Sequence, residues 1–119
     1  MAAGSTPALI CDTGALLDYL VEDAADHVLF RNAIDRARAR YVPGLVVAEL
    51  DYFLRHERSA MKAFVADLAS GAFTYAPPVL DQILRAMEID RRYGELGLGI
   101  VDASVVALAD QLDIRRIAT

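Results

Sequence analysis

Cysteine is almost absent from the sequence, tryptophan is entirely absent, and lysine and histidine are rare. The single cysteine, Cys11, can form no disulfide within the chain, which fits a reducing compartment such as the cytoplasm. The two histidines, His27 and His56, lie far apart in the sequence and belong to no zinc-ligand pattern. The first residues are small and polar without a basic segment, so we expect no secretory signal peptide.

Long hydrophobic runs are missing as well, and so is an excess of positive charge. The most apolar run is interrupted by Asp102 and ends at Asp110, well short of the roughly 20 residues that a membrane-spanning helix requires. With 12 Lys and Arg residues against 17 Asp and Glu residues, the net charge is −5, which argues against nucleic-acid binding through bulk positive charge. An enzyme whose carboxylates hold metal ions is not excluded, because bound metal reverses the local charge.

The 119 residues, 55% of them hydrophobic, suffice for a single domain over residues 1–119, with a loose tail at residues 1–7. Short apolar runs alternate with segments of helical periodicity, a pattern typical of an α/β fold with a central parallel sheet of about four strands. Strands are predicted at residues 8–11, 41–43, 73–76 and 114–119. Helices are predicted after residue 14, over residues 27–40, 44–54, 59–70 and 79–93, and from residue 101 onward.

Helical spacing also predicts which side of each helix packs on the core. In the helix over residues 79–93 the inward stripe is expected to contain Leu80, Ile83, Leu84, Met87 and Ile89. In the helix over residues 27–40, the residues expected to face inward are Val28, Phe30, Ala33, Ile34 and Ala37. The other helices are also expected to turn apolar side chains inward, among them Phe53, Val65, Val106 and Leu112.

Three carboxylates are expected to meet at one edge of this sheet. Asp12 follows the first strand, Glu49 lies in the helix after the second, and Asp102 is placed where the last helix begins. Carboxyl ends of parallel strands share an edge, and three carboxylates gathered there would repel one another unless cations lie between them. Oxygen-only ligands suit Mg²⁺ or Mn²⁺ better than zinc. Such a site can activate a water molecule and hold a phosphodiester oxygen.

Simpler roles remain open for each of these side chains. Asp12 could serve only as the N-cap of the helix that follows it, and Asp102 could cap its own backbone at the helix start. Glu49 shares a helix side with Val46 and Leu50, so it should be at least partly buried, where an unpaired carboxylate is uncommon.

Four stretches spanning most of the chain carry a resemblance to a known family. They read CDTGALL at 11–17, VPGLVVAELDYFL at 42–54, YGELGLGIVDASVVALA at 93–109 and RIAT at 116–119. In this order and spacing they resemble the PIN-domain ribonucleases, and among them the VapC-type toxins of bacterial toxin–antitoxin pairs. The resemblance implies a three-layer α/β/α fold and metal-dependent cleavage of RNA. It also implies a homodimer and a VapB-type antitoxin whose C-terminal segment lies across the active site.

The resemblance carries the family's acidic residues over onto Asp12, Glu49 and Asp102, and its frequent Thr or Ser after the first Asp onto Thr13, which helps to order the site. Family members usually have a fourth acidic residue after the strand matching residues 116–119, and then a fifth strand, whereas this sequence ends at Thr119. Asp110 cannot substitute, and Asp113 even less so, because they lie roughly 12 and 16 Å along the helix from Asp102.

RNA contact would then depend on basic side chains near the sheet edge that carries Asp12, Glu49 and Asp102, the acidic edge, rather than on bulk charge. The candidates are Arg91, Arg92, Arg115 and Arg116, for which a merely solvated surface is the alternative.

Two other functions stay open at this stage. The missing fourth carboxylate would also suit a PIN-fold binding module without useful catalysis that sequesters antitoxin or RNA. A receiver-like phosphoacceptor domain fits less well, because that fold usually has paired acidic residues after the first strand and a lysine near the end of the domain. Here Asp12 stands alone after that strand, and Lys62 is the only lysine.

Overall fold

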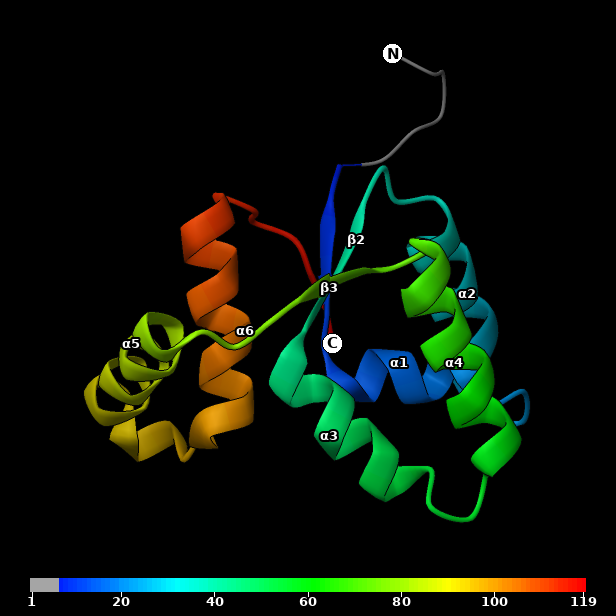
Figure 1. Cartoon of the computed structure of the whole chain (residues 1–119), viewed down its shortest axis with the longest axis horizontal. Helices are drawn as coiled ribbons and strands as arrows, with labels where there is room; N and C mark the ends of the chain where they lie inside the picture. The colour runs from blue at the N-terminus through cyan, green and yellow to red at the C-terminus, as the bar shows by residue number, and fades with distance from the viewer. Residues whose placement is uncertain (1–6) are drawn as a thin grey trace.

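The computed structural model describes residues 7–119 as a sheet of four parallel strands between two groups of helices (Figure 1). The strands lie in the order β3-β2-β1-β4 and are β1 (Leu9–Cys11), β2 (Arg40–Pro43), β3 (Thr74–Ala76) and β4 (Ile117–Ala118). The helices are α1 (Thr13–Leu20), α2 (His27–Asp35), α3 (Gly44–Phe53), α4 (Arg58–Ser70), α5 (Leu80–Arg92) and α6 (Gly99–Leu112), with the short η1 (Gly94–Leu96) before α6. The predicted parallel α/β architecture is confirmed. The predicted tail falls, apart from Pro7, outside the described residues.

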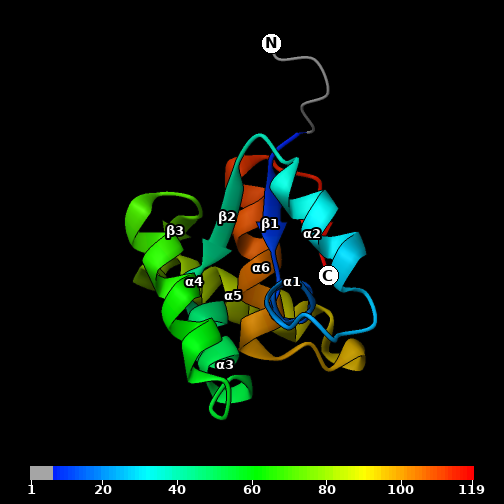
Figure 2. The same cartoon turned by 90° about the vertical axis from the view of Figure 1, so that its right-hand side faces the viewer.

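The sheet is covered on both sides, which explains why its central strand is wholly apolar. Helices α5 and α6 lie against one face, and α1, α2 and α4 lie against the other (Figures 1 and 2). All three residues of β1 are buried, as expected for a parallel strand with helices on both faces. Cys11, its last residue, is completely enclosed. In residues 7–119 no helix is long and apolar enough to cross a membrane.

Strand register brings two distant segments together at the carboxyl edge of the sheet. Cys11 of β1 pairs with Ala118 of β4, so the residues that follow them, Asp12 and Thr119, leave the sheet side by side. On the other side of β1, strand β2 ends at Pro43 and continues directly into α3. The beginnings of α1 and α3 therefore lie at the edge where functional sites of open α/β sheets are found.

The helix predicted over residues 27–40 is too long. It ends at Asp35, because the chain must turn before Arg40, where β2 already begins. Only one side of α2 packs on the sheet layer, through the buried Ile34, while Val28 and Ala33 are exposed, contrary to expectation.

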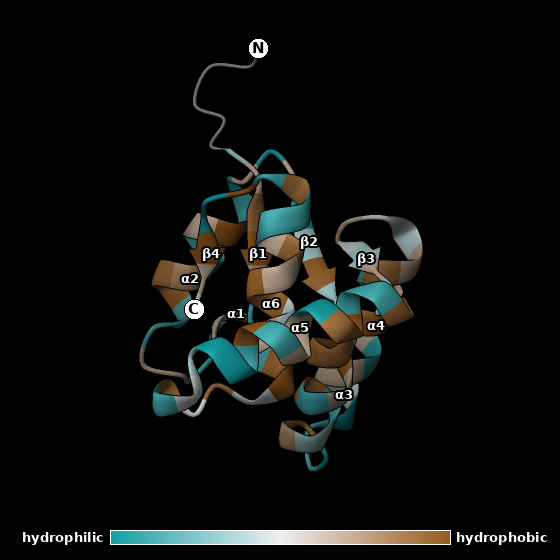
Figure 3. Cartoon of the chain, turned by 90° about the vertical axis from the view of Figure 1, so that its left-hand side faces the viewer, coloured by the Kyte–Doolittle hydropathy of each residue, from teal (hydrophilic) through white to brown (hydrophobic). Residues whose placement is uncertain are grey.

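Helix α5 buries only part of the stripe predicted for it. Leu80 and Leu84 are 69% and 60% exposed, and Met87 is also exposed. Ile89 is buried as predicted, together with Ala86, and both pack against small residues of α6. Two apolar sides were available, and the small side allows the two helices to approach closely. Figure 3 looks onto α5 from outside, where brown segments alternate with teal along the helix.

Four further positions expected to face inward are also exposed. They are Phe53, Val65, Val106 and Leu112. Each lies on a helix whose buried side is narrower than the apolar stripe in its sequence, because the neighbouring elements cover only part of that stripe.

Candidate active site

Asp12 is held by three backbone or side-chain contacts where β1 passes into α1. Its carboxylate Oδ1 accepts the backbone N–H of Thr13 at 2.7 Å, and its Oδ2 accepts the hydroxyl of Thr119 at 3.3 Å. Its own N–H donates to the carbonyl of Ala118 at 2.9 Å. Asp12 is thus the N-cap of α1, and the simpler role considered from the sequence is real. The capping contact uses Oδ1, while Oδ2 faces the sheet edge, where Thr119 donates to it.

Thr13 contributes a second polar group at the same point. Its side chain is buried, and among residues 7–119 its Oγ1 is the buried side-chain atom that finds no hydrogen-bond partner. Leaving a buried hydroxyl unsatisfied costs about 1–3 kcal/mol. A polar ligand bound next to the Asp12 carboxylate would supply the hydrogen bond that this hydroxyl lacks.

Glu49 lies on α3 at the boundary between its buried and exposed sides. It is half-buried, as the spacing of its neighbours predicted, and within the described part of the chain it forms no hydrogen bond or ion pair. The next acidic residue, Asp51, points elsewhere and binds Arg58 at 2.7 Å. Glu49 is therefore free to act at the edge, whereas Asp51 serves the packing of α3 on α4.

Asp102 does not cap its helix. Helix α6 begins at Gly99, two residues earlier than predicted, so Asp102 lies one turn inside it on an exposed side. The start of α6 is held instead by Asp90 of α5, whose Oδ1 accepts the N–H of Gly99 at 2.9 Å. Within residues 7–119 the carboxylate of Asp102 has no hydrogen-bond partner, so the capping role considered for it is wrong.

The three carboxylates influence one another electrostatically. Partial burial, and then the negative charges of Asp12 and Glu49, raise the pKa of Asp102 above its usual value. No ion pair in the described residues includes any of the three. They are close enough for their charges to add. Yet no three acidic, histidine or cysteine side chains of residues 7–119 gather tightly enough to form a ready metal-ligand cluster.

This chemistry fits a hard divalent cation. The donors are carboxylate oxygens with a buried hydroxyl beside them, and within residues 7–119 no ion pair with a basic side chain compensates their charge. Mg²⁺ binds through one or two carboxylates and keeps several waters, so it does not need a complete protein cage. The residues that would hold it are Asp12, Asp102 and Glu49.

Comparison with known proteins identifies the family of this fold. A model of the PIN domain family matches residues 9–119. The chain belongs to the PIN-domain family. It is 39% identical over 114 residues to Ribonuclease VapC26 of Mycobacterium tuberculosis, in an alignment that covers 93% of this chain and 84% of that protein.

The fold of this PIN domain also matches a solved structure, the crystal structure of Mycobacterium tuberculosis VapC20, described as a sarcin–ricin loop cleaving toxin. The TM-score is 0.79, with 92% of this chain and 86% of that chain covered and 19% of residues identical. At that identity the likeness concerns the fold alone.

The four arginines predicted to contact RNA lie in two separate pairs, one at the end of α5 and one before β4. Arg91 and Arg92 end α5, just before the turn that leads to the start of α6, and Arg91 binds Glu88 at 2.6 Å. Arg115 and Arg116 precede β4, at the opposite end of that strand from Thr119. Arg115 and Arg116 nevertheless line one pocket together with Thr119, whose hydroxyl contacts Asp12. RNA contact by either pair therefore stays a prediction.

Two residues with a role at the edge were not singled out from the sequence. Thr119 contacts Asp12, and Asp90 holds the start of the helix that carries Asp102. The signal for Thr119 would have been the order of the strands, because only β4 next to β1 brings it there. Asp90 gives no local signal, since its partner Gly99 belongs to another helix. Asp110 binds Arg85 at 3.3 Å and Asp113 ends α6, so neither joins the edge.

Asp102→Asn is expected to stabilise the metal-free protein at neutral pH. The pKa of Asp102 is raised in the folded state, so its ionisation disfavours folding once the pH exceeds that pKa. The amide removes this penalty, and the gain in the free energy of unfolding should be less than about 1 kcal/mol for an exposed side chain. In acid, where the wild-type carboxyl is protonated, the two proteins should unfold alike. Thermal melts with chelator at both pH values provide the measurement, and equal melts at neutral pH would contradict the expectation.

Proposed function

We propose that this PIN domain is a metal-dependent endoribonuclease toxin of the VapC type. The observation that carries the proposal is the uncompensated acidic edge formed by Asp12, Glu49 and Asp102, in a chain 39% identical to a ribonuclease. An RNA phosphodiester is the substrate, and the cleavage is hydrolytic. The lone buried cysteine agrees with action in the cytoplasm, where cellular RNA lies.

The chain's residues would divide the work as follows. Asp12, fixed by the N–H of Thr13 and the hydroxyl of Thr119, presents one oxygen in a constant direction to Mg²⁺ or Mn²⁺. Glu49 and Asp102 add negative charge from two other elements. When bound, the cation would lower the pKa of a water molecule and offset the charge that develops on the phosphate.

A VapB-type antitoxin is the proposed protein partner, and it would neutralise the toxin. The support is the similarity to VapC26 and the open acidic edge, which a partner segment can cover. A second function has its own observation. Because three side chains do not already form a tight cluster, a catalytically weak PIN-fold module that sequesters antitoxin or RNA would fit as well.

Calorimetric titration with Mg²⁺ or Mn²⁺ separates the two functions. The wild type should bind the metal, and Asp102→Asn should lose most of the binding because one of three ligands is gone. Asp110→Asn is the matched control, since that carboxylate binds Arg85 away from the edge. Metal binding followed by RNA cleavage supports the enzyme. Tight RNA or antitoxin binding without metal-dependent turnover supports the binding module.

The exposed aliphatic row of α5 is the proposed surface for a homodimer. Leu80, Leu84 and Met87 recur at helical spacing and find no cover in the described residues, and rows of this kind pack against another helix. Leu84→Lys should shift the protein from dimer to monomer in sedimentation velocity. Val28→Lys, on the exposed side of α2, is the control and should leave the dimer unchanged. A dimer that persists with Leu84→Lys would place the interface elsewhere.

A further inference from the structure

The end of α3 exposes two aromatic side chains beside the acidic edge. Tyr52 is 60% exposed and Phe53 is 52% exposed, although large aromatic side chains are usually well covered. They lie three and four residues after Glu49, so all three share one side of the helix. A group bound at the carboxylates would therefore have these rings about one helical turn away.

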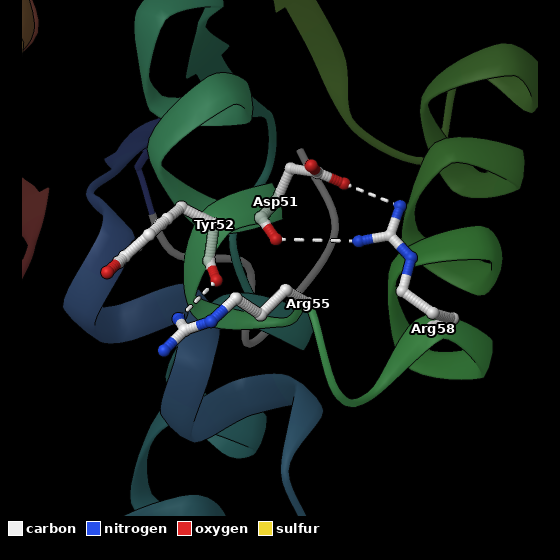
Figure 4. A network of polar contacts seen from close by, with 4 residues as sticks. All are labelled: Asp51, Tyr52, Arg55 and Arg58. Atoms are coloured by element: carbon white, nitrogen blue, oxygen red, sulfur yellow. Dashed lines mark hydrogen bonds and ion pairs between the residues drawn. The ribbon is translucent and has the colours of Figure 1, made fainter.

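Arg55 packs against the Tyr52 ring and fixes its position. Its guanidinium carbon lies 4.3 Å from the centre of the Tyr52 ring, and its Nη1 donates to the carbonyl oxygen of Tyr52 at 2.8 Å (Figure 4). The guanidinium is thereby held over the ring. The Phe53 ring stands edge-on at 5.6 Å from the Tyr52 ring. Because Tyr52 is mostly exposed, its other face remains open.

Arg55 brings a positive charge to the Tyr52 ring. Arg58, the other arginine at this turn, is engaged by Asp51 on the side of α3 that faces α4, as Figure 4 shows. Arg55 takes part in none of the ion pairs found among residues 7–119. Its charge is therefore available to whatever covers Tyr52, in a chain whose net charge is −5.

We propose that the Tyr52 ring, backed by Arg55, stacks on an unpaired base of RNA next to the nucleotides held at the acidic edge. Aromatic rings and guanidinium planes are the groups on which single-stranded bases stack, because every base offers a π face. The aliphatic row on α5 is different in kind, since it has the side chains that helices use to pack on one another. The proposal rests on the proposed function, because it takes RNA as the ligand.

Binding of a short, unstructured, fluorescein-labelled RNA in chelator tests the stacking without cleavage. Tyr52→Leu keeps an apolar side chain but removes the ring, and it should weaken binding about tenfold or more. Tyr52→Phe should bind within about twofold of the wild type, because the ring remains. Tyr75→Leu removes a comparably exposed ring from β3 and should have no effect. An RNA with abasic positions should bind the wild type and Tyr52→Leu equally.

The outcomes separate this inference from the function on which it rests. If the wild type binds RNA and Tyr52→Leu binds it equally well, the stacking site is wrong while the nuclease proposal stands. If the wild type binds no RNA, both fail. If Tyr52→Leu leaves RNA binding unchanged but changes the sedimentation coefficient, the ring belongs to a protein interface and the inference is overturned. The inference is supported if Tyr52→Leu weakens binding of the base-containing RNA but not of the RNA with abasic positions.

Discussion

Asp12→Asn is expected to reduce RNA cleavage by about a hundredfold or more without unfolding the protein. Metal-bound charge stabilises a phosphoryl transition state by several kcal/mol, and each 1.36 kcal/mol corresponds to a factor of ten in rate. Asparagine keeps the size of the side chain and an oxygen that accepts the N–H of Thr13, so the start of α1 is preserved. Only the charge is lost. Cleavage of a labelled RNA with excess enzyme and Mg²⁺ measures the rate.

The control for this variant is Asp23→Asn, in the exposed acidic segment between α1 and α2. It makes the same chemical change away from the edge and should cleave RNA at the wild-type rate. Circular dichroism should show the same fold for all three proteins. Cleavage by Asp12→Asn at the wild-type rate would remove the acidic edge from the mechanism.

Gly44→Ala is expected to have the largest effect on stability among changes that add a single methyl group. A Cβ at this position would lie 2.4 Å from Cδ of Pro78 and 2.9 Å from the hydroxyl oxygen of Tyr75. The proline ring is part of the backbone and cannot swing away, so the start of α3 must move. Overpacking of this kind costs about 1–3 kcal/mol of the free energy of unfolding. For a domain of this size the thermal midpoint should fall by several degrees.

Gly14→Ala is the matched control. A Cβ there meets nothing within 4 Å, and alanine is the better helix former inside α1, so this variant should be as stable as the wild type or slightly more stable. Gly44 begins the helix that carries Glu49, so Gly44→Ala should also lower metal affinity. Thermal melts of both variants give the comparison. A Gly44→Ala protein as stable as the wild type would show that the contact with Pro78 relaxes freely.

The acidic edge could be predicted because it depends on local sequence and a general rule of topology. Asp12 follows a continuous apolar run, and Glu49 follows the next strand by only a few residues. Parallel strands place such residues at one edge whatever their order in the sheet. Local sequence also accounts for Gly71, a glycine that ends α4 with a positive φ of 87°.

The misses concern choices that only tertiary contacts decide. Helix α5 has an aliphatic side and a small-residue side, and its periodicity alone favours the larger side chains. The structure buries Ala86 instead, because α6 offers Ala103 and Ala107 as a close-fitting surface. The contacts of Asp90 and Thr119 join segments that are far apart in sequence or belong to different helices, so no local pattern indicates them.

The enclosure of Cys11 has a further consequence for studying the protein. Burial raises the pKa of its thiol to about 12, so almost none of it is the reactive thiolate at neutral pH. Alkylating reagents can then reach it only when the centre of the sheet opens. Because Cys11 is the single cysteine, its labelling rate reports how often β1, the strand that leads into Asp12, separates from its neighbours.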